Sequence, residues 1–258
     1  MDKEPFPPRL FEDLLKIQNS NESEINQLKK WFISQLRDLP WRGKEISPYA
    51  VWVSEVMLQQ TQVSVVIPYF ERWMRLFPSV EALAKAPIAT VLKEWEGLGY
   101  YARARNLHEG ARYVMDQCQG TIPSSAEELK KIKGLGDYTV GAILSFAFHQ
   151  RAAAVDGNVM RVLARYYALP DDISKGTTQK KLRGMAKDLL PEEEPWIIAE
   201  ALIELGATIC TRNPKCSECP LVRSCAGFAQ GLANQLPVKS AKTVTQYLYR
   251  LVPVIACG

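Results

Sequence analysis

The sequence has no apolar stretch that is long enough to cross a membrane. Polar residues interrupt its longest apolar runs well before the roughly 18 to 20 residues that a transmembrane helix needs. Residues 1–15 carry acids and prolines, whereas a secretory signal begins with basic residues and continues with an apolar run. We therefore expect an intracellular protein that has no membrane as its partner.

An excess of charge of one sign is also missing. The 32 basic and 28 acidic side chains leave a net charge of +4, which permits nucleic-acid binding but does not indicate it. Hydrophobic residues make up 47% and charged residues 23% of the sequence, so a mostly disordered or collagen-like chain is excluded. A length of 258 residues fits one large domain or two closely packed domains.

Strict alternation of polar and apolar residues is rare, so strands are not predicted for most of the chain. Apolar residues instead recur at spacings of three and four, for example across residues 159–167, and eight prolines from Pro40 to Pro191 separate segments of helix length. The fold should be all-α, with about ten helices. Residues 227–245 predict a linker and residues 246–257 a first β-strand, whose partner is missing, so we expect a truncated C-terminal domain.

Two glycines, Gly134 and Gly136, lie between two segments with helical periodicity. This spacing allows a sharp turn and a close approach of the backbone to a partner. Such a turn would aim backbone N–H groups at an anion, at the start of the helix predicted over Tyr138–Phe148, and a DNA phosphate is the natural anion. Three lysines within residues 130–133 add positive charge, so a DNA-gripping helix-hairpin-helix is favoured over an ordinary helical hairpin.

Four of the six cysteines are Cys210, Cys216, Cys219 and Cys225, with five, two and five residues between successive members. An intracellular protein seldom carries a disulfide framework, so these thiols indicate a metal centre rather than disulfides or buried packing. Soft sulfur ligands favour iron–sulfur or zinc. Zinc sites commonly use two short cysteine hooks, and only Cys216 and Cys219 form one, so the spacing favours a [4Fe-4S] cluster while zinc stays open.

Two carboxylates stand in contrasting surroundings. Glu55 has apolar neighbours in the sequence, so its pKa should be raised, which suits a proton donor near neutral pH. Asp156 is placed as the N-cap of the following helix, where the helix dipole should keep it ionised. Cleavage of a glycosidic bond requires such a donor and such an anion. Each residue alone could be structural, but their occurrence beside a DNA-gripping hairpin favours catalysis.

Residues 54–63, residues 97–107, the glycine hairpin, residues 155–159 and the four cysteines together carry a family resemblance. They look like the MutY-type adenine DNA glycosylases, a branch of the endonuclease III superfamily, over about residues 26–230. The reaction that this resemblance implies is the removal of adenine mispaired with 8-oxoguanine or guanine from double-stranded DNA, after base flipping, in base excision repair. It implies a monomer that is cytoplasmic in a bacterium and nuclear or mitochondrial in a eukaryote.

The resemblance also implies a division into domains. Residues 46–152 would form a six-helix barrel with the helix-hairpin-helix, and residues 26–45 and 153–230 a helical iron–sulfur cluster domain, with the DNA cleft between them. Residues 1–25 would be an N-terminal extension. Residues 231–258 would be a linker and the start of a truncated domain that resembles nucleotide hydrolases and recognises 8-oxoguanine.

Roles follow from the resemblance residue by residue. Glu55 matches the acid that protonates adenine, Asp156 the carboxylate that stabilises the sugar cation and assists water attack, and Asn158 a residue that orients this site. Tyr138 lies where bifunctional relatives carry a Schiff-base lysine, which implies hydrolysis without an obligatory lyase step. The remaining matches are the duplex wedges Gln60 and Tyr100, the adenine-pocket residues Trp41, Arg42 and Glu200, and the DNA-backbone residues Lys133, Gly134, Leu135 and Gly136.

One departure concerns the first cysteine interval. The family pattern has six residues there, whereas Cys210 and Cys216 enclose five. The shorter loop can still reach a cluster, because an extended chain spans about 3.5 Å per residue. Two other functions stay open: a pyrimidine-directed glycosylase with lyase activity, which would need a lysine at position 138, and a non-catalytic DNA-binding module, in which Glu55 and Asp156 could be neutralised without effect.

Overall fold

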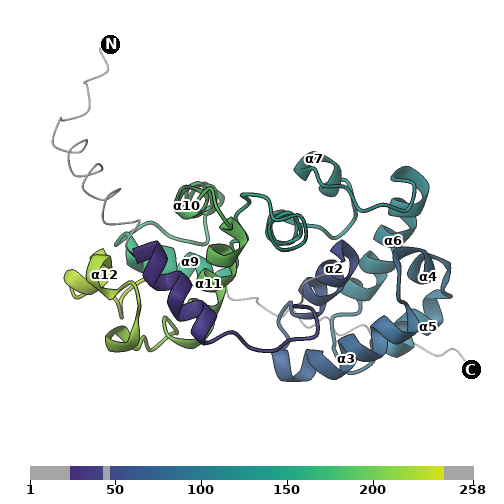
Figure 1. Ribbon diagram of the computed structural model, residues 1–258, viewed down its shortest axis with the longest axis horizontal. Coiled ribbons are helices and arrows are strands. Elements are labelled where there is room, and N and C mark those ends of the chain that lie inside the picture. The colour runs from purple at the N-terminus through teal and green to yellow at the C-terminus, as the bar shows by residue number, and fades with distance from the viewer. Residues whose placement is uncertain (1–23, 43–46, 241–258) are drawn as a thin grey trace, which may run out of the picture.

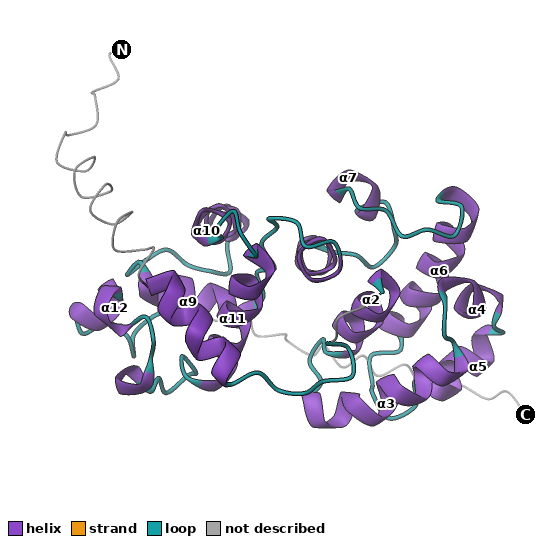
Figure 2. Ribbon diagram, viewed as in Figure 1, coloured by secondary structure: helices purple, strands orange, loops and turns teal. Residues whose placement is uncertain are grey.

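The computed structural model describes residues 24–42 and 47–240. All regular elements within these residues are helices (Figure 2), as the sequence periodicity predicts. In this part of the chain, no helix combines the length and the apolar character that spanning a membrane requires. The strand predicted over residues 246–257 and most of the extension predicted over residues 1–25 lie outside the described residues.

The helices gather in two lobes that lie side by side (Figure 1). We call the first the N-lobe; it holds α2 (Pro48–Met57), α3 (Val63–Leu76), α4 (Val80–Lys85), α5 (Ile88–Glu94), α6 (Ala102–Gln117), α7 (Ala126–Leu129), α8 (Asp137–Ala142) and the π-helical segment η1 (Ile143–Ala147). We call the second the C-lobe; it holds α9 (Gly157–Tyr166), α10 (Gly176–Leu189), α11 (Pro195–Thr208), the 3-10 segments η2 (Cys216–Glu218) and η3 (Val222–Ser224), and α12 (Ala226–Ala229). The helical residues 24–34 lie against the C-lobe.

Helix α2 runs through the middle of the N-lobe. It begins where Ser47 Oγ accepts a hydrogen bond from Ala50 N (3.1 Å), with Pro48 in the first turn. From Val51 to Met57 every side chain is buried, because α3, α6, α8 and η1 all pack against this helix. An acidic residue in this stretch therefore has little access to water, and that residue is Glu55.

The segment from α8 to η1 joins the two lobes. Both α2 of the N-lobe and α11 of the C-lobe pack against η1. The helix predicted over Tyr138–Phe148 begins at Asp137 and changes from α-helix to π-helix at Ile143, which the apolar spacing could not indicate. A π-helical turn takes an extra residue, and such turns often occur next to functional sites.

Candidate active site

Glu55 is a buried carboxylic acid at the junction of the lobes, with 7% of its surface exposed. Tyr138 Oη donates a hydrogen bond to Glu55 Oε2 (2.7 Å). The pKa of Glu55 is raised to about 7: burial is the largest cause, the charges of Glu200 and Asp156 also raise the pKa, and the bond from Tyr138 and the charge of Arg42 lower it. The raised pKa that the sequence predicts is therefore confirmed.

Asp156 is the N-cap of α9, as predicted. Its Oδ1 accepts hydrogen bonds from Asn158 N (2.9 Å) and Val159 N (2.8 Å), and its Oδ2 accepts one from Asn158 Nδ2 (2.8 Å). Burial nevertheless raises the pKa of Asp156 above its usual value, because desolvation outweighs these bonds and the charge of Arg161. The N-cap position alone predicts a shift in the opposite direction, since it takes no account of the surrounding side chains.

A cavity of about 460 Å³ opens between the lobes. This volume lies within the roughly 300–1,000 Å³ typical of small-molecule sites. The cavity brings together residues that are more than 150 positions apart in the sequence. Among its lining residues are these candidates from the sequence: Trp41, Arg42, Glu55, Tyr138, Asp156, Asn158 and Glu200.

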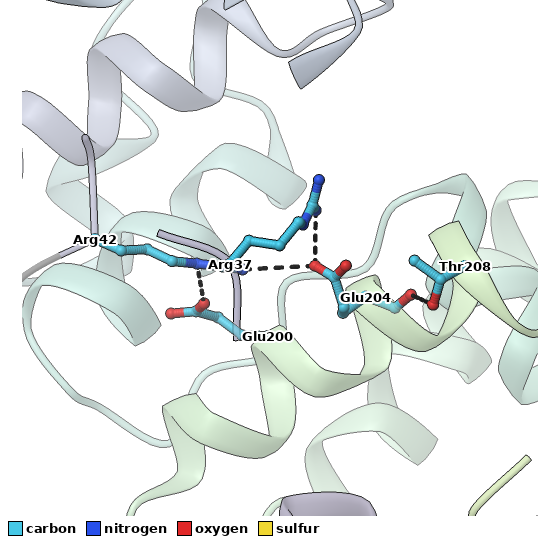
Figure 3. Close-up of polar contacts among 5 residues, drawn as sticks. All are labelled: Arg37, Arg42, Glu200, Glu204 and Thr208. Atoms are coloured by element: carbon cyan, nitrogen blue, oxygen red, sulfur yellow. Dashed lines mark hydrogen bonds and ion pairs between the residues drawn. The ribbon is translucent and has the colours of Figure 1, made fainter. Parts of the chain in front are cut away.

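Ion pairs hold one wall of this cavity (Figure 3). Arg42 Nε donates to Glu200 Oε2 (2.8 Å), and Arg42 Nη2 lies 3.8 Å from Glu204 Oε2, which also accepts from Arg37 Nη2 (2.8 Å). The remaining nitrogen, Arg42 Nη1, is buried and has no hydrogen-bond partner among the described residues. An unpaired buried donor is costly, so a shift of the neighbouring side chains that gave this atom an acceptor would be favourable.

Arg37 and Glu204 line the cavity although the sequence reading did not single them out. Glu204 follows Glu200 by one helical turn on α11, so the two carboxylates share a face, and this spacing was the available signal. For Arg37 the sequence offers no comparable signal. Its ion pair with Glu204 forms only because the segment before α2 passes close to α11 in the folded protein.

A second, more open hollow adjoins the cavity and shares Glu55, Tyr138 and Asp156 with it. Gln60, Gly134 and Gly136 also line this hollow, so the glycine hairpin lies next to the two carboxylates. Gly134 has φ of 87°, which side chains rarely tolerate, and a Cβ there would come within 2.7 Å of Asn106 Cβ. Gly136 has ordinary backbone angles and open space around it, so it keeps the surface accessible rather than making the turn.

Two of the hairpin lysines and Leu135 already have partners within the protein. Lys133 pairs with Glu109, and Lys130 Nζ pairs with Asp137 Oδ1 (2.9 Å). The Leu135 side chain is buried, and its N–H donates to Ile132 O (3.2 Å). These lysines would have to exchange an internal carboxylate for a phosphate in order to bind DNA.

Tyr100 lies outside both hollows and is one of the most exposed large side chains, at 63%. Its backbone has φ of 48°, and that of Gln60 has φ of 59°. Both predicted wedges therefore have a left-handed backbone that non-glycine residues seldom adopt.

The four clustered cysteines line one small apolar hollow in the C-lobe, together with Arg165 and Phe228. All four are free thiols and half-buried. Burial raises the pKa of Cys219 to about 12 and also raises the pKa of Cys225. Within residues 24–42 and 47–240, no three or more Cys, His, Asp or Glu side chains form a group that could hold a metal ion as they stand.

Arg161 connects the cysteine loop to Asn158. Arg161 Nη2 donates to Asn158 Oδ1 (2.8 Å) and to Gly206 O (2.8 Å), and its Nε donates to Cys210 O (2.8 Å). The helices come this close because position 206 is glycine: a Cβ there would lie 2.7 Å from Asn158 Cβ. The orientation of Asn158 thus depends on α11 and on the first cysteine.

Comparison with known proteins identifies the family of this chain. Residues 53–187 match the family model for the HhH-GPD superfamily base excision DNA repair protein. The chain is 44% identical over 225 residues to the adenine DNA glycosylase of Homo sapiens, covering 84% of this chain and 40% of that protein. It is 40% identical over 207 residues to the adenine DNA glycosylase of Buchnera aphidicola subsp. Baizongia pistaciae, covering 80% and 58%. The chain spans about half the length of the curated relatives it matches.

Solved structures show the same fold. A thermostable thymine-DNA glycosylase matches with a TM-score of 0.74 at 26% identity, covering 83% of this chain and 99% of that chain. Endonuclease III in a non-covalent complex with DNA matches with a TM-score of 0.69 at 21% identity, covering 83% and 97%, and this likeness concerns the fold alone. With more than half of its residues in the matched region, the chain belongs to the HhH-GPD superfamily of base excision DNA repair proteins.

Proposed function

We propose that this chain is a monofunctional DNA glycosylase that hydrolyses adenine from double-stranded DNA where it is mispaired with 8-oxoguanine or guanine. The observation that carries the proposal is the buried Glu55, with a pKa of about 7, facing the same cavity as the N-cap carboxylate of Asp156. The base is assigned from the curated relatives, which are named adenine DNA glycosylases.

In this mechanism protonated Glu55 donates its proton to a ring nitrogen of adenine. The bond between the base and the sugar then breaks, and its electron pair leaves with the base. The ionised Asp156 stabilises the positive charge that develops on the sugar. The side-chain amide of Asn158 donates a hydrogen bond that holds Asp156 Oδ2 in place. Water adds to the sugar and loses a proton to Asp156, which gives free adenine and an abasic site.

The cavity wall supplies contacts to the base. Arg42 and Glu200 both line the cavity and supply N–H donors and carboxylate acceptors, so together they suit a heterocycle with ring nitrogens and an amino group. Trp41 offers an aromatic surface in the same cavity. A base inside a duplex cannot reach a cavity between two lobes, so the nucleotide must flip out of the helix.

Hydrolysis without a lyase step is supported by the residues that line the cavity. Tyr138 stands at the position of the Schiff-base lysine, and none of the described lining residues is a lysine. Among the described residues, no amine is therefore available there to capture the sugar. This composition disfavours the pyrimidine-directed lyase alternative.

We further propose that Cys210, Cys216, Cys219 and Cys225 hold a [4Fe-4S] cluster. They line one small apolar hollow, so four soft sulfur ligands face a shared space. A cuboidal cluster binds one thiolate at each of its irons, and the intervals of five, two and five residues lack the two short cysteine hooks that are common in zinc sites. When bound, the cluster would supply a structural centre for the loop.

The lobes support the domain division predicted from the sequence. The N-lobe would be the barrel domain of residues 46–152, and the C-lobe with residues 26–45 would be the cluster domain of residues 153–230. Ion pairs of Lys29 with Glu194 and of Arg37 with Glu204 attach the early segment to α11. DNA would bind at the entrance that the glycine hairpin and Gln60 share.

A base-release assay tests the proposal. Duplexes with adenine opposite 8-oxoguanine, guanine or thymine, and one with thymine opposite guanine, are incubated with the protein, and alkali then cleaves abasic sites. We expect product from the first two duplexes and no borohydride-trapped complex.

The variant Glu55→Gln tests the acid. It should slow base release by about 100-fold to 10,000-fold while DNA binding persists, and Glu71→Gln, at an exposed position, is the matched control. Full activity of Glu55→Gln would refute the acid assignment, whereas DNA binding without product from the wild-type protein would favour the non-catalytic binding module.

A further inference from the structure

Arg103 lies in the first turn of α6 and is buried, with 9% of its surface exposed. Its guanidinium group lies between two loops. One is the turn after α2, over residues 58–62, and the other connects α5 to α6, over residues 95–101. We call them the Gln60 loop and the Tyr100 loop after the residues at their tips.

One end of the guanidinium group binds the Gln60 loop. Arg103 Nη1 donates to Val56 O (2.9 Å), Met57 O (2.9 Å) and Gln59 O (2.7 Å). The first two are among the last carbonyl groups of α2, which lack partners within the helix and attract positive charge. The third belongs to the residue directly before Gln60.

The other end binds the Tyr100 loop. Arg103 Nη2 donates to Leu98 O (2.9 Å) and Gly99 O (3.3 Å), and it also reaches Thr61 Oγ1 (3.3 Å) in the Gln60 loop. The guanidinium carbon lies 5.3 Å from the Trp95 ring centre and 5.6 Å from the Tyr100 ring centre. Both distances suit a cation–π contact.

This arrangement explains how two unfavourable backbone conformations persist side by side. Gln60 and Tyr100 have φ of 59° and 48°, and such residues need surroundings that hold them in place. In each loop, Arg103 binds the carbonyl group that immediately precedes the left-handed residue, Gln59 in one and Gly99 in the other. Both tips are exposed, so they are free to meet a partner.

We infer that Arg103 is a positioning residue that couples the Gln60 and Tyr100 loops into one rigid wedge. The inference rests on the proposed function in one respect, the action of the wedge on a base pair. A rigid wedge enters a duplex with both tips in register, whereas two independent loops would lose conformational freedom on binding. Lysine cannot replace this arginine, because a single ammonium nitrogen cannot extend a planar fork toward both loops.

Hydrogen exchange on the DNA-free protein tests the coupling without reference to any reaction. Arg103→Lys keeps the charge but removes the fork, so amides in both loops should exchange faster while those in α11 stay unchanged. Arg151→Lys is the matched control, since Arg151 also donates to a carbonyl group, Leu190 O (2.7 Å), in another part of the protein. Faster exchange in only one loop, or in neither, would overturn the inference.

Single-turnover excision separates positioning from a general structural effect. Arg103→Lys should slow excision roughly 100-fold when adenine is paired opposite guanine, and only a few-fold when adenine lies opposite an abasic site and needs no separation. Equal losses on both substrates would overturn the inference. Absence of excision by the wild-type protein would instead refute the proposed function and leave the exchange result valid.

If Arg103→Lys does not fold, a double-mutant cycle on the wild-type background decides the question. Gln60→Ala and Tyr100→Ala should be non-additive in the excision rate on the paired substrate, because removing one tip of a coupled wedge already impairs the other. Strictly additive losses would mean that the two loops act independently.

Discussion

Tyr138 Oη donates a 2.7 Å hydrogen bond to Glu55 Oε2 inside the cavity between the lobes. The bond favours the ionised form of Glu55, yet burial dominates and raises the pKa of that carboxyl group to about 7. Burial and the neighbouring carboxylate raise the pKa of Tyr138 well above its usual value, so the phenol remains a donor. Near neutral pH the proton that can be released therefore belongs to Glu55.

The first prediction concerns the pH dependence of excision. Only protonated Glu55 can donate a proton, so the single-turnover rate should fall as the pH rises above about 7. Tyr138→Phe removes a hydrogen bond that stabilises the carboxylate, so the pKa of Glu55 should rise and the fall in rate should move to higher pH. Rates measured between pH 5 and 9 for both proteins test this. An unchanged profile in Tyr138→Phe would show that the bond does not tune the acid.

The second prediction concerns stability. The pKa of Glu55 rises from 4.5 to about 7 on folding, so the folded state keeps a proton that the unfolded state releases between these values. Stability is therefore lost as the pH rises through this window, and the loss reaches on the order of 3 kcal/mol above pH 7. Glu55→Gln should unfold at a higher temperature than wild type at pH 8 and show little difference at pH 4.5. Glu71→Gln should show no such contrast.

Much of the site could be predicted from short motifs. The apolar neighbours of Glu55 in the sequence become its neighbours in space, because α2 is buried on all sides. Asp156 precedes its helix directly, so its role as N-cap is a local property that the sequence contains. Local motifs specify the catalytic groups because a helix fixes the positions of residues a few places apart.

Other features depend on contacts between distant segments. Arg37 meets Glu204 across 167 positions, and Arg103 binds Val56 O across 47, so no spacing rule indicates either contact. Burial raises the pKa of Asp156, and the N-cap motif contains no information about this burial. The π-helical turn at η1, against which both α2 and α11 pack, likewise has no signal in the apolar spacing.

The third prediction separates the chemical and structural roles of Asp156. Asp156→Asn removes the anion beside the developing cation, so excision should slow by roughly 100-fold or more. The amide oxygen can still cap α9. Burial disfavours the ionised form of Asp156, so removing the charge should not lower the melting temperature. Asp156→Ala should slow excision similarly and also cost about 0.5–2 kcal/mol of stability. Normal excision by a folded Asp156→Asn protein would exclude a catalytic role.

The fourth prediction concerns the cysteine loop. Residues 210–225 contain only the short segments η2 and η3, and Leu221 is their one fully buried apolar side chain among the described residues. A loop with so little packing of its own should depend on its metal for a fixed shape. Natively purified protein should therefore hold about four irons per chain, and stoichiometric zinc would contradict the cluster assignment.

Cys219→Ser tests the same loop by removing one of its proposed cluster ligands. The variant should lose iron and unfold at a lower temperature, whereas Cys118→Ser, which changes a half-buried thiol outside the loop, should retain both properties. Lys215 and Arg223 lie in the loop and can face phosphates. Loss of the loop's shape should therefore weaken DNA binding by a larger factor than it slows excision in the protein–DNA complex. Binding titrations and single-turnover rates at saturating protein distinguish these effects. A soluble Cys219→Ser protein without iron that binds DNA normally would show that the loop holds its shape without a cluster.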